Sequence, residues 1–358
     1  MRFHVVSLPH TQTTEAFSCC AYTEKVRKFC KMMKGRGHSV FLYAGGLNAA
    51  PCDEWVTCIT ESERRQAVGE KPYVEASFDW SLPHWQNFNQ NTIEAMRRRI
   101  KPQDFICLIA GIAQKQIADA FPNHLTVEFG IGYGGSFANF RVWESYAWMH
   151  ACYGSKVPNT HDLDGKWFDC VIPNYFEPEL FPFQAAKGDY YLFMGRLVAR
   201  KGAVIAADVC ERLGKALILA GLGEWSGYGT HVGIVGPKER GGLMAGAKAL
   251  FCPTQYIEPF GGVAVEAMMC GTPAITTDWG AFPETVIQGK TGFRCRTLQE
   301  FVDAAEHVGE LDAEVIRRHA VNNYSLEAIA PKYEAYFERL NTLWHEGWYS
   351  IRSREKAA

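Results

Sequence analysis

The stretch EPFGGVAVE at residues 258–266 is the part of this 358-residue sequence that most strongly indicates its fold. It follows the apolar run at 249–253, which predicts a buried strand, and Pro259 suits the first turn of a helix. The two glycines let a ligand approach the main chain where the helix begins, and free amides there attract phosphate. Because Glu258 lies in the loop and Glu266 in the helix, the two carboxylates can contact different parts of one ligand.

Short apolar strands alternate with helical patterns on both sides of this stretch, which is typical of parallel α/β sheets. In the first half of the chain, the sequence predicts strands at 3–7, 39–43, 55–59, 105–110, 125–129 and 169–174. Helices are expected over 22–33, from about Ala304, and over 325–344. Residues 61–91 are expected to be irregular, and the length of the chain predicts two domains.

The motifs around the first stretch resemble, in order and spacing, those of the retaining glycosyltransferases of family four. They are the segments 191–202, 258–266, 271–275, 280–284 and 289–293. The resemblance implies an α/β protein of the GT-B fold, in which two Rossmann-like domains have parallel sheets that face a central cleft. It implies an N-terminal acceptor-side domain at 1–176 and a nucleotide-sugar-binding domain at 177–334. A C-terminal helix at about 335–358 is expected to pack back on the first domain.

The resemblance also implies a donor site in the second domain. Arg196 and Lys201 would hold the donor diphosphate, Glu258 would contact hydroxyls of the sugar, and Glu266 would bind the ribose. The other donor-binding positions are Gly195, Gly236, and the amides of Phe260, Gly261 and Gly262. Two fixed cations can neutralise a leaving diphosphate without a metal. The predicted catalytic residues are therefore Glu258, Arg196 and Lys201, no metal or cofactor is expected, and a UDP-sugar is favoured over a GDP-sugar as co-substrate.

Two segments of the second domain have alternative interpretations. Residues 232–236 fit either a backbone contact to the nucleotide base or a packed strand and turn. Glu284 fits either an acid that supports the site or a carboxylate at a helix start.

The first domain departs from the family. Many members carry a glycine pair after the first strand, where this chain has LPHTQTT at 8–14. Many also carry a His after the strand that corresponds to 125–129, where this chain has Glu-Phe-Gly. Possible contacts in their place are His10, Glu128 and Tyr133. In the segment 61–91, Trp80 and Trp85 could stack on an acceptor ring.

Basic side chains gather in two parts of the first domain. One set lies on the first helix (Lys25, Arg27, Lys28, Lys31, Lys34), and the other is Arg97, Arg98, Arg99 and Lys101. A solvated surface is the default interpretation. The alternatives are peripheral contact with an anionic membrane that carries a lipid acceptor, or with a nucleic acid that carries a modified base. A net charge of -2 gives no global attraction to either, so the acceptor class and the oligomeric state stay open.

Composition describes an ordinary globular chain, with 47% hydrophobic and 21% charged residues. No apolar run is long enough to cross a bilayer and the N-terminus lacks a secretory pattern, so a cytoplasmic protein is expected. The 12 cysteines show no zinc spacing and are predicted to be free, buried thiols.

Two further motifs suggest other kinds of site. Residues 130–135 fit the GxGxxG pattern, but the next clear strand is near Val171, and no acid sits at a strand end at the ~20-residue distance that a ribose-binding carboxylate needs. Asp162 and Asp164 have the DxD form of a metal site but lie in a polar loop, which favours a solvated turn. The sequence therefore predicts a metal-independent glycosyltransferase that moves a sugar from a nucleotide-diphosphate sugar to an acceptor hydroxyl. Retention follows from the resemblance. The alternatives are a nucleotide-sugar epimerase of GT-B-like fold and a noncatalytic nucleotide-sugar binding protein.

Overall fold

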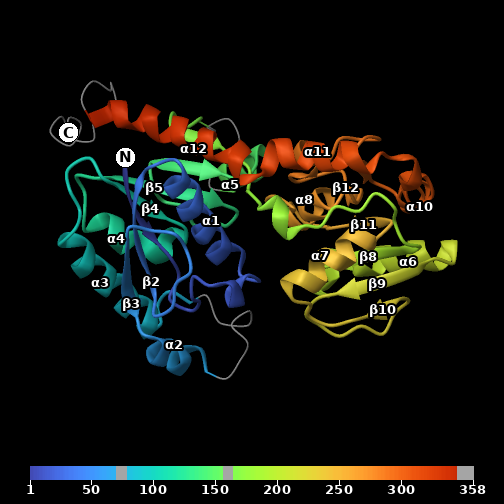
Figure 1. The fold of residues 1–358 in the computed structure, drawn as a ribbon, viewed down its shortest axis with the longest axis horizontal. Coiled ribbons are helices and arrows are strands. Elements are labelled where there is room, and N and C mark those ends of the chain that lie inside the picture. Colours follow the sequence, from blue (N-terminus) through green and yellow to red (C-terminus); the bar gives the residue numbers. More distant parts are fainter. Residues whose placement is uncertain (70–78, 156–163, 345–358) are drawn as a thin grey trace. The chain divides into compact units, whose positions relative to one another are not determined.

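The computed structural model describes residues 1–69, 79–155 and 164–344, which form two compact units, each built on one parallel sheet (Figure 1). Unit 1 comprises Met1–Trp143, Asp164–Ile172 and the chain from Ile329. Unit 2 comprises the described part of Glu144–Leu163 together with Pro173–Ala328. Within the described ranges, no helix is both long and apolar enough to cross a membrane.

Unit 1 contains a seven-stranded sheet in the order β3-β2-β1-β4-β5-β6-β7. The strands are β1 (Arg2–Val6), β2 (Ser39–Gly45), β3 (Glu54–Ile59), β4 (Phe105–Leu108), β5 (Leu125–Ile131), β6 (Phe140–Trp143) and β7 (Asp169–Val171). The strand order reverses between β1 and β4, which pair in parallel. In such sheets, ligands bind beyond the carboxyl ends of the strands at this reversal.

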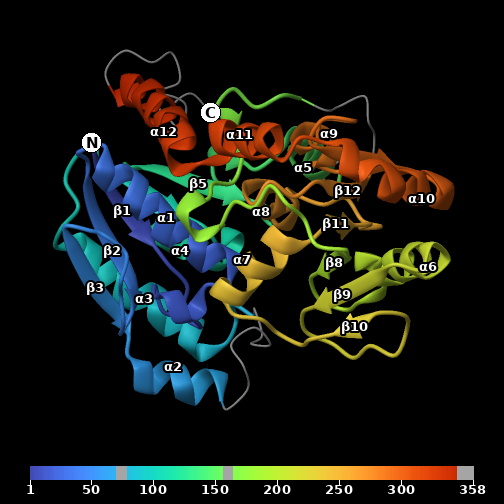
Figure 2. The same cartoon turned by 45° about the vertical axis from the view of Figure 1, so that its right-hand side comes forward.

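Helices cover both faces of the first sheet (Figures 1 and 2). They are α1 (Ala21–Gly35), α2 (Glu61–Val68), α3 (Pro83–Arg97), α4 (Lys115–Asp119) and α12 (Leu326–Asn341). The ring of Phe3 on β1 lies 6.1 Å from that of Phe29 on α1 and 4.6 Å from that of Phe337 on α12. Val6 instead packs in a cluster with Phe88 of α3. The final long helix therefore completes the core of the first unit.

Unit 2 contains a six-stranded sheet in the order β10-β9-β8-β11-β12-β13. The strands are β8 (Tyr190–Met194), β9 (Ala216–Ala220), β10 (Thr230–His231), β11 (Ala249–Cys252), β12 (Ala274–Thr277) and β13 (Gly292–Cys295). The helices are α5 (Tyr146–Gly154), α6 (Ala203–Leu213), α7 (Pro237–Gly246), α8 (Gly262–Met269), α9 (Phe282–Thr285), α10 (Leu298–His307) and α11 (Ala313–Tyr324). Leu250 packs with α7, α8 and α11, whereas its neighbour Phe251 packs with α6 and α10. The order reverses between β8 and β11, so the loops after these two strands leave the sheet side by side.

Several elements differ from the sequence-based expectations. In the described parts of 61–91, α2 and α3 replace the expected irregular structure, and residues 70–78 lie outside the described range. Thr60 and Glu63 cap α2 reciprocally, and an apolar stripe that includes Trp85 buries α3. The strand that follows β5 is β6 rather than the one near Val171. Helix α10 begins at Leu298 rather than near residue 304, because Thr297 caps it there.

The division of the chain also differs from a single boundary at residue 176. Residues from Glu144 belong to unit 2, where Ser145, directly before α5, donates to the carbonyl of Pro259 in the loop after β11. The chain returns to unit 1 at Asp164 and enters unit 2 again at Pro173. At the C-terminus, unit 1 resumes at Ile329, earlier than the expected residue 335, and residues 345–358 lie outside the described range.

Candidate active site

The loop after β11 is held along its length before any ligand binds. The carbonyls of Thr254, Tyr256 and Glu258 accept hydrogen bonds from Thr277 Oγ1 (2.9 Å), Trp279 Nε1 (3.2 Å) and the amide of Ala281 (3.0 Å). These donors lie at the end of β12 and in the loop after it, next to β11 in the sheet. The polypeptide that carries Glu258 is therefore preorganised by its neighbour.

The start of α8 presents backbone amides, as the sequence predicts. Gly261 has a φ of 76°, a left-handed conformation that favours glycine, and a Cβ there would lie 2.5 Å from Cε1 of Phe282. The side chain of Phe260 is buried, so only its backbone can face a ligand. In the part of the chain that the structure describes, no acceptor takes the amides of Phe260, Gly261 or Gly262. Such amides are suited to bind an anion.

Lys201 and Glu258 form an ion pair between the loops after β8 and β11. Lys201 Nζ donates to Glu258 Oε2 at 2.8 Å, and the two side chains are only 23% and 14% exposed. Burial lowers the pKa of Lys201, but the charge of Glu258 and the hydrogen bond to it outweigh burial and raise that pKa above its usual value. Gly202 follows with a φ of 76°, and a Cβ there would lie 2.1 Å from the carbonyl oxygen of Pro253. Glycine is therefore required for the turn that brings Lys201 to the second loop.

Tyr256 is a residue of this site that the sequence analysis missed. Arg200 Cζ and Lys201 Nζ lie 4.9 and 5.0 Å from the centroid of its ring, so two cations pack against one aromatic ring. Burial raises the pKa of Tyr256, which keeps its hydroxyl protonated. Its only signal in the sequence is its position two residues before Glu258.

Gly195 and Arg196, two further residues of the predicted donor site, lie directly after β8. Arg196 is exposed in the loop after that strand, which also carries Lys201. A Cβ on Gly221, after β9, would lie 1.9 Å from the carbonyl oxygen of Gly195. The loops after β8 and β9 are therefore in direct backbone contact. The side chain of Arg196, the residue after Gly195, is exposed and can reach a ligand.

Glu266 is mostly buried on α8 and forms an ion pair with Arg240 of α7, which the sequence analysis also missed. Gly236 is exposed and directly precedes the first turn of α7. In the segment 232–236, the side chains of Val232 and Ile234 are 42% and 56% exposed, unlike those of a packed strand.

Glu284 acts on the start of a helix other than its own. Its two carboxylate oxygens accept from the amides of Tyr146 (3.0 Å) and Ala147 (2.8 Å), in the first turn of α5. This arrangement agrees with the helix-start interpretation, because a carboxylate complements the positive end of the helix dipole.

A cavity of about 10 Å³, room for about one water molecule, adjoins the ion pair and is lined by Lys201, Glu258 and Gly261 among others. A larger hollow of about 510 Å³ lies between β13 and α10 and contains no predicted donor-site residue. Motif chemistry and the sheet reversal, rather than cavity size, therefore locate the candidate site.

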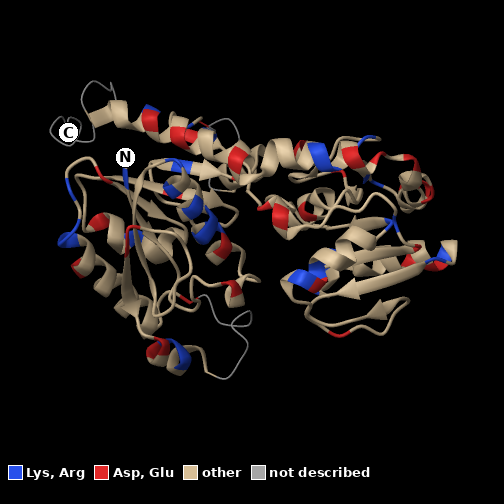
Figure 3. Cartoon of the chain, in the orientation of Figure 1, with Lys and Arg blue, Asp and Glu red and all other residues tan. Residues whose placement is uncertain are grey.

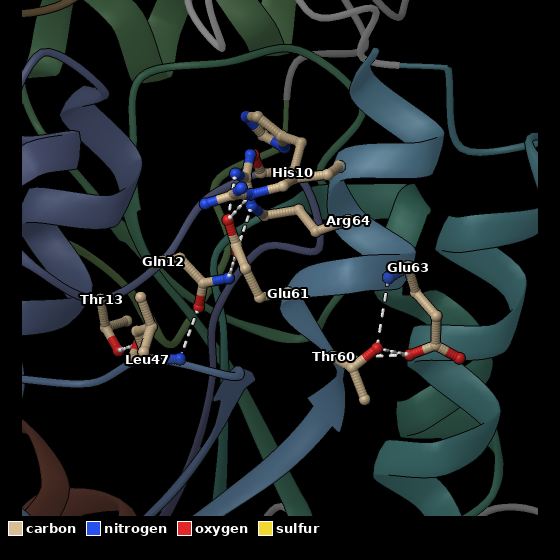
Figure 4. A network of polar contacts seen from close by, with 9 residues as sticks. His10, Gln12, Thr13, Leu47, Thr60, Glu61, Glu63 and Arg64 are labelled. Atoms are coloured by element: carbon tan, nitrogen blue, oxygen red, sulfur yellow. Dashed lines mark hydrogen bonds and ion pairs between the residues drawn. The ribbon is translucent and has the colours of Figure 1, made fainter. Parts of the chain in front are cut away.

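In unit 1, side chains of α2 form hydrogen bonds with the loop after β1 (Figure 4). Glu61 accepts from Gln12 Nε2 (2.5 Å) and Arg64 Nε (2.7 Å), and Arg64 also donates to the carbonyl of His10 (3.3 Å). The hydrogen bond from Arg64 is the largest cause that lowers the pKa of Glu61 to about 2. His10 is buried rather than exposed, and its ring lies 6.1 Å from that of Trp85.

We expect the buried His10 to make unfolding pH-dependent. Burial lowers the pKa of His10 to about 4, below the 6.5 expected for the unfolded chain. Between these values the unfolded chain takes up a proton that the folded chain does not, so stability falls as the pH falls through this window. From pH 7 to pH 5, His10→Gln should lose roughly 2 kcal/mol less stability than the wild type in urea unfolding. Equal losses in the two proteins would contradict this prediction.

Glu128 and Tyr133 are engaged within unit 1. Glu128 is fully buried, and its Oε2 accepts from the amides of Phe137 (2.8 Å) and Ala138 (2.7 Å), while the hydroxyl of Tyr133 donates to Oε1 at 3.4 Å. Burial raises the pKa of Glu128. These contacts hold the loop between β5 and β6, so the carboxylate does not face an open surface.

The two candidate acceptor residues differ in exposure. Trp85 is fully buried in α3, so it belongs to the core and cannot stack on a ligand at the surface. Trp80 is 46% exposed just before α3 and can do so. Sequence alone does not separate them, because burial depends on the helix that only Trp85 occupies.

Acidic positions lie beside both basic sets along the backbone (Figure 3). Lys25 is buried and donates to the carbonyl of Gly130 at 2.9 Å, which contradicts a fully solvated helix surface. Lys34 pairs with Asp53 at 2.7 Å, and Arg99 pairs with Glu54 at 2.7 Å. These ion pairs reduce the net positive charge of both sets.

The GxGxxG motif finds no support in the fold. Strand β5 runs through Gly130 and Ile131 and is followed by β6, with no helix among the described residues between them. A dinucleotide motif requires a helix there. Asp162 lies outside the described residues, and in the described ranges no three His, Cys, Asp or Glu side chains are grouped to hold a metal ion. All 12 cysteines are free, and most are buried, although Cys19 is exposed.

Comparisons with known proteins give a family match for the second half of the chain. Residues 178–325 match the family model described as glycosyl transferases group 1. A glycogen synthase of Mycobacterium tuberculosis (strain CDC 1551 / Oshkosh) is 33% identical over 147 residues, 35% of each chain. Spore coat protein SA of Bacillus subtilis (strain 168) is 30% identical over 96 residues, 27% of this chain and 26% of that protein. The match thus spans about a third of the curated relatives.

Two solved structures resemble nearly the whole chain. Sucrose-phosphate synthase from Thermosynechococcus elongatus has a TM-score of 0.71 and 17% identity, and the match covers 95% of this chain and 99% of that one. Anabaena HepE, solved with UDP and glucose, has a TM-score of 0.65 and 17% identity over 96% of this chain and 100% of that one. This chain therefore has the GT-B fold, and its residues 178–325 match the model of glycosyl transferases group 1.

Proposed function

We propose that this protein transfers a sugar from a nucleoside-diphosphate sugar, a UDP-sugar before a GDP-sugar, to an acceptor hydroxyl with retention of configuration. The observation that carries the proposal is the ion pair between Lys201 and Glu258 at 2.8 Å, beside the start of α8. The family model and the UDP and glucose bound to HepE support the choice of donor.

The arrangement suits a leaving diphosphate. Lys201 and Arg196 supply positive charge from the loop after β8, and the amides of 260–262 supply dipoles at the start of α8. Glu258 would orient the sugar through its hydroxyls, and Glu266 would bind the ribose. With its charge neutralised, the diphosphate can depart on the face that the acceptor approaches, and its oxygen can take the acceptor proton.

The test begins with calorimetric titration of UDP and GDP, followed by UDP-sugars with and without glycan, lipid and small-molecule acceptors. Transfer of sugar to an acceptor supports the proposal, and it should persist in EDTA because Arg196 and Lys201 supply the positive charge. Conversion of the donor without an acceptor would identify an epimerase, and binding without turnover a noncatalytic protein. Loss of activity in EDTA with rescue by manganese would overturn the metal-independent mechanism.

Glu258→Gln should damage turnover more than nucleotide binding. The amide keeps the shape of the side chain but loses charge-assisted bonds to sugar hydroxyls, which should lower kcat about 10- to 100-fold. Lys201 stays charged, so calorimetry should give a Kd for UDP within about threefold of the wild type. Glu211→Gln, an exposed acid on α6, is the matched control for charge. A Kd that rises as much as kcat falls would place Glu258 on the nucleotide instead.

A further inference from the structure

We infer that Ser145, in the segment between β6 and α5, is a positioning residue that sets the conformation of the 258–262 loop for the donor. The inference rests on the proposed function for its catalytic consequence. The contact itself stands on the geometry, because the Ser145 hydroxyl lies 2.6 Å from the carbonyl oxygen of Pro259. The Ser145 side chain is buried, so no solvent competes for this bond.

The Ser145 hydroxyl has its donor and acceptor roles divided between two partners. Its oxygen accepts the amide of Trp148 at 3.0 Å, which caps α5, and its single proton is therefore directed to Pro259. One side chain thus caps the helix and fastens the loop.

The hydrogen bond from Ser145 fixes more than one atom of the loop. A trans peptide is planar and its N–H points away from its carbonyl, so holding the Pro259 carbonyl aims the Phe260 amide in the opposite direction. On the other side of Pro259, the carbonyl of Glu258 is held by Ala281 at 3.0 Å. Phe260 is one of the predicted donor contacts, and its amide has no acceptor in the described part of the chain. Ser145 therefore orients a group that binds the ligand without touching the ligand itself.

Glu284 keeps Ser145 in place. It accepts from two amides in the first turn of α5, and a Cβ on Gly280, four residues earlier, would lie 2.6 Å from the amide nitrogen of Glu258. The segment 280–284 therefore packs against the loop with one end and holds the start of α5 with the other.

Ser145→Gly separates the two roles of the hydroxyl, because glycine is nearly as good a helix cap but cannot donate to Pro259. We expect Ser145→Gly and Ser145→Ala to raise the Kd of UDP about tenfold, the effect of one misdirected bond to a charged ligand. Thr297→Ala is the matched control, because it removes a capping hydroxyl from α10 in the same unit. It should leave the Kd within about twofold of the wild type.

Hydrogen exchange in the ligand-free protein tests the contact without relying on the function. Peptides that cover Ala264 and Ala281, whose amides donate to the carbonyls of Gly261 and Glu258 in this loop, should exchange about tenfold faster in Ser145→Gly than in the wild type or Thr297→Ala, because one restraint on a folded loop is lost. Unchanged exchange in Ser145→Gly would overturn the inference, as would faster exchange with an unchanged Kd for UDP. If the wild type binds neither UDP nor GDP, the proposed function fails, and faster exchange would still support the positioning of the loop.

Discussion

Replacing Lys201 with alanine is expected to weaken binding of UDP about 10- to 100-fold, because the diphosphate loses a charge-assisted contact. Lys201→Ala also leaves Glu258, which is 14% exposed, without the cation that lies 2.8 Å away. The uncompensated carboxylate would then repel the diphosphate. Both effects act in the same direction, so calorimetry should show a larger loss for this substitution than for any other single change at the site.

Lys215→Ala provides the control for Lys201→Ala. Lys215 forms an exposed ion pair with Asp189 at 3.4 Å in the same unit, away from the loop after β11. Exposed pairs contribute little to stability, about 0 to 1 kcal/mol. UDP binding should therefore be unchanged in Lys215→Ala. If Lys201→Ala also binds UDP as tightly as the wild type, the diphosphate lies elsewhere and the proposed site is wrong.

Gly202→Ala is expected to destabilise unit 2 by about 3 kcal/mol, the sum of a left-handed alanine and an overpacked contact. The added methyl group would lie 2.1 Å from the carbonyl oxygen of Pro253, and backbone on both sides prevents a cheap adjustment. Relief of this clash would separate the loops after β8 and β11. Lys201 would then move away from Glu258, so UDP affinity should fall together with the unfolding midpoint.

Gly214→Ala separates the two causes of that loss. Gly202 directly precedes α6, and Gly214 directly follows it. Gly214 also has a positive φ, 59°, but a Cβ there would meet nothing within 4 Å. Gly214→Ala should lower the free energy of unfolding only by the cost of a left-handed alanine, about 1 kcal/mol, and leave UDP binding unchanged. Equal stabilities of Gly202→Ala and Gly214→Ala in urea unfolding would show that the close contact with Pro253 is not present.

The elements that carry the candidate donor site are predictable because their signals are local. A strand, a glycine-containing loop and a helix start follow one another around both Lys201 and Glu258, and each of these steps is written in consecutive residues. The sheet reversal then brings the two loops together, since β8 and β11 are neighbours. The pairing of the two predicted side chains follows from topology rather than from any further motif.

The residues that the sequence did not reveal are fixed by tertiary contacts. Ser145 and Arg240 act through partners more than 20 positions away, and nothing near them in the chain indicates those partners. Burial has the same origin. His10 and Trp85 have the chemistry of binding residues, but the folding of α3 and of the loop after β1 places them inside unit 1. The sequence suggests an accessible surface for both Trp80 and Trp85. Trp80 keeps that surface because it lies just outside α3.

The return of α12 to the first sheet has a consequence for synthesis on the ribosome. The aromatic surface formed by Phe3, Phe29 and Phe105 emerges early, but Phe337, which covers it, is translated after the whole of unit 2. Until then unit 1 exposes an apolar face, the kind of surface that leads nascent chains to aggregate or to recruit chaperones. A chain truncated just before α12 should therefore have a folded second unit and a first unit that exposes an apolar, aggregation-prone surface.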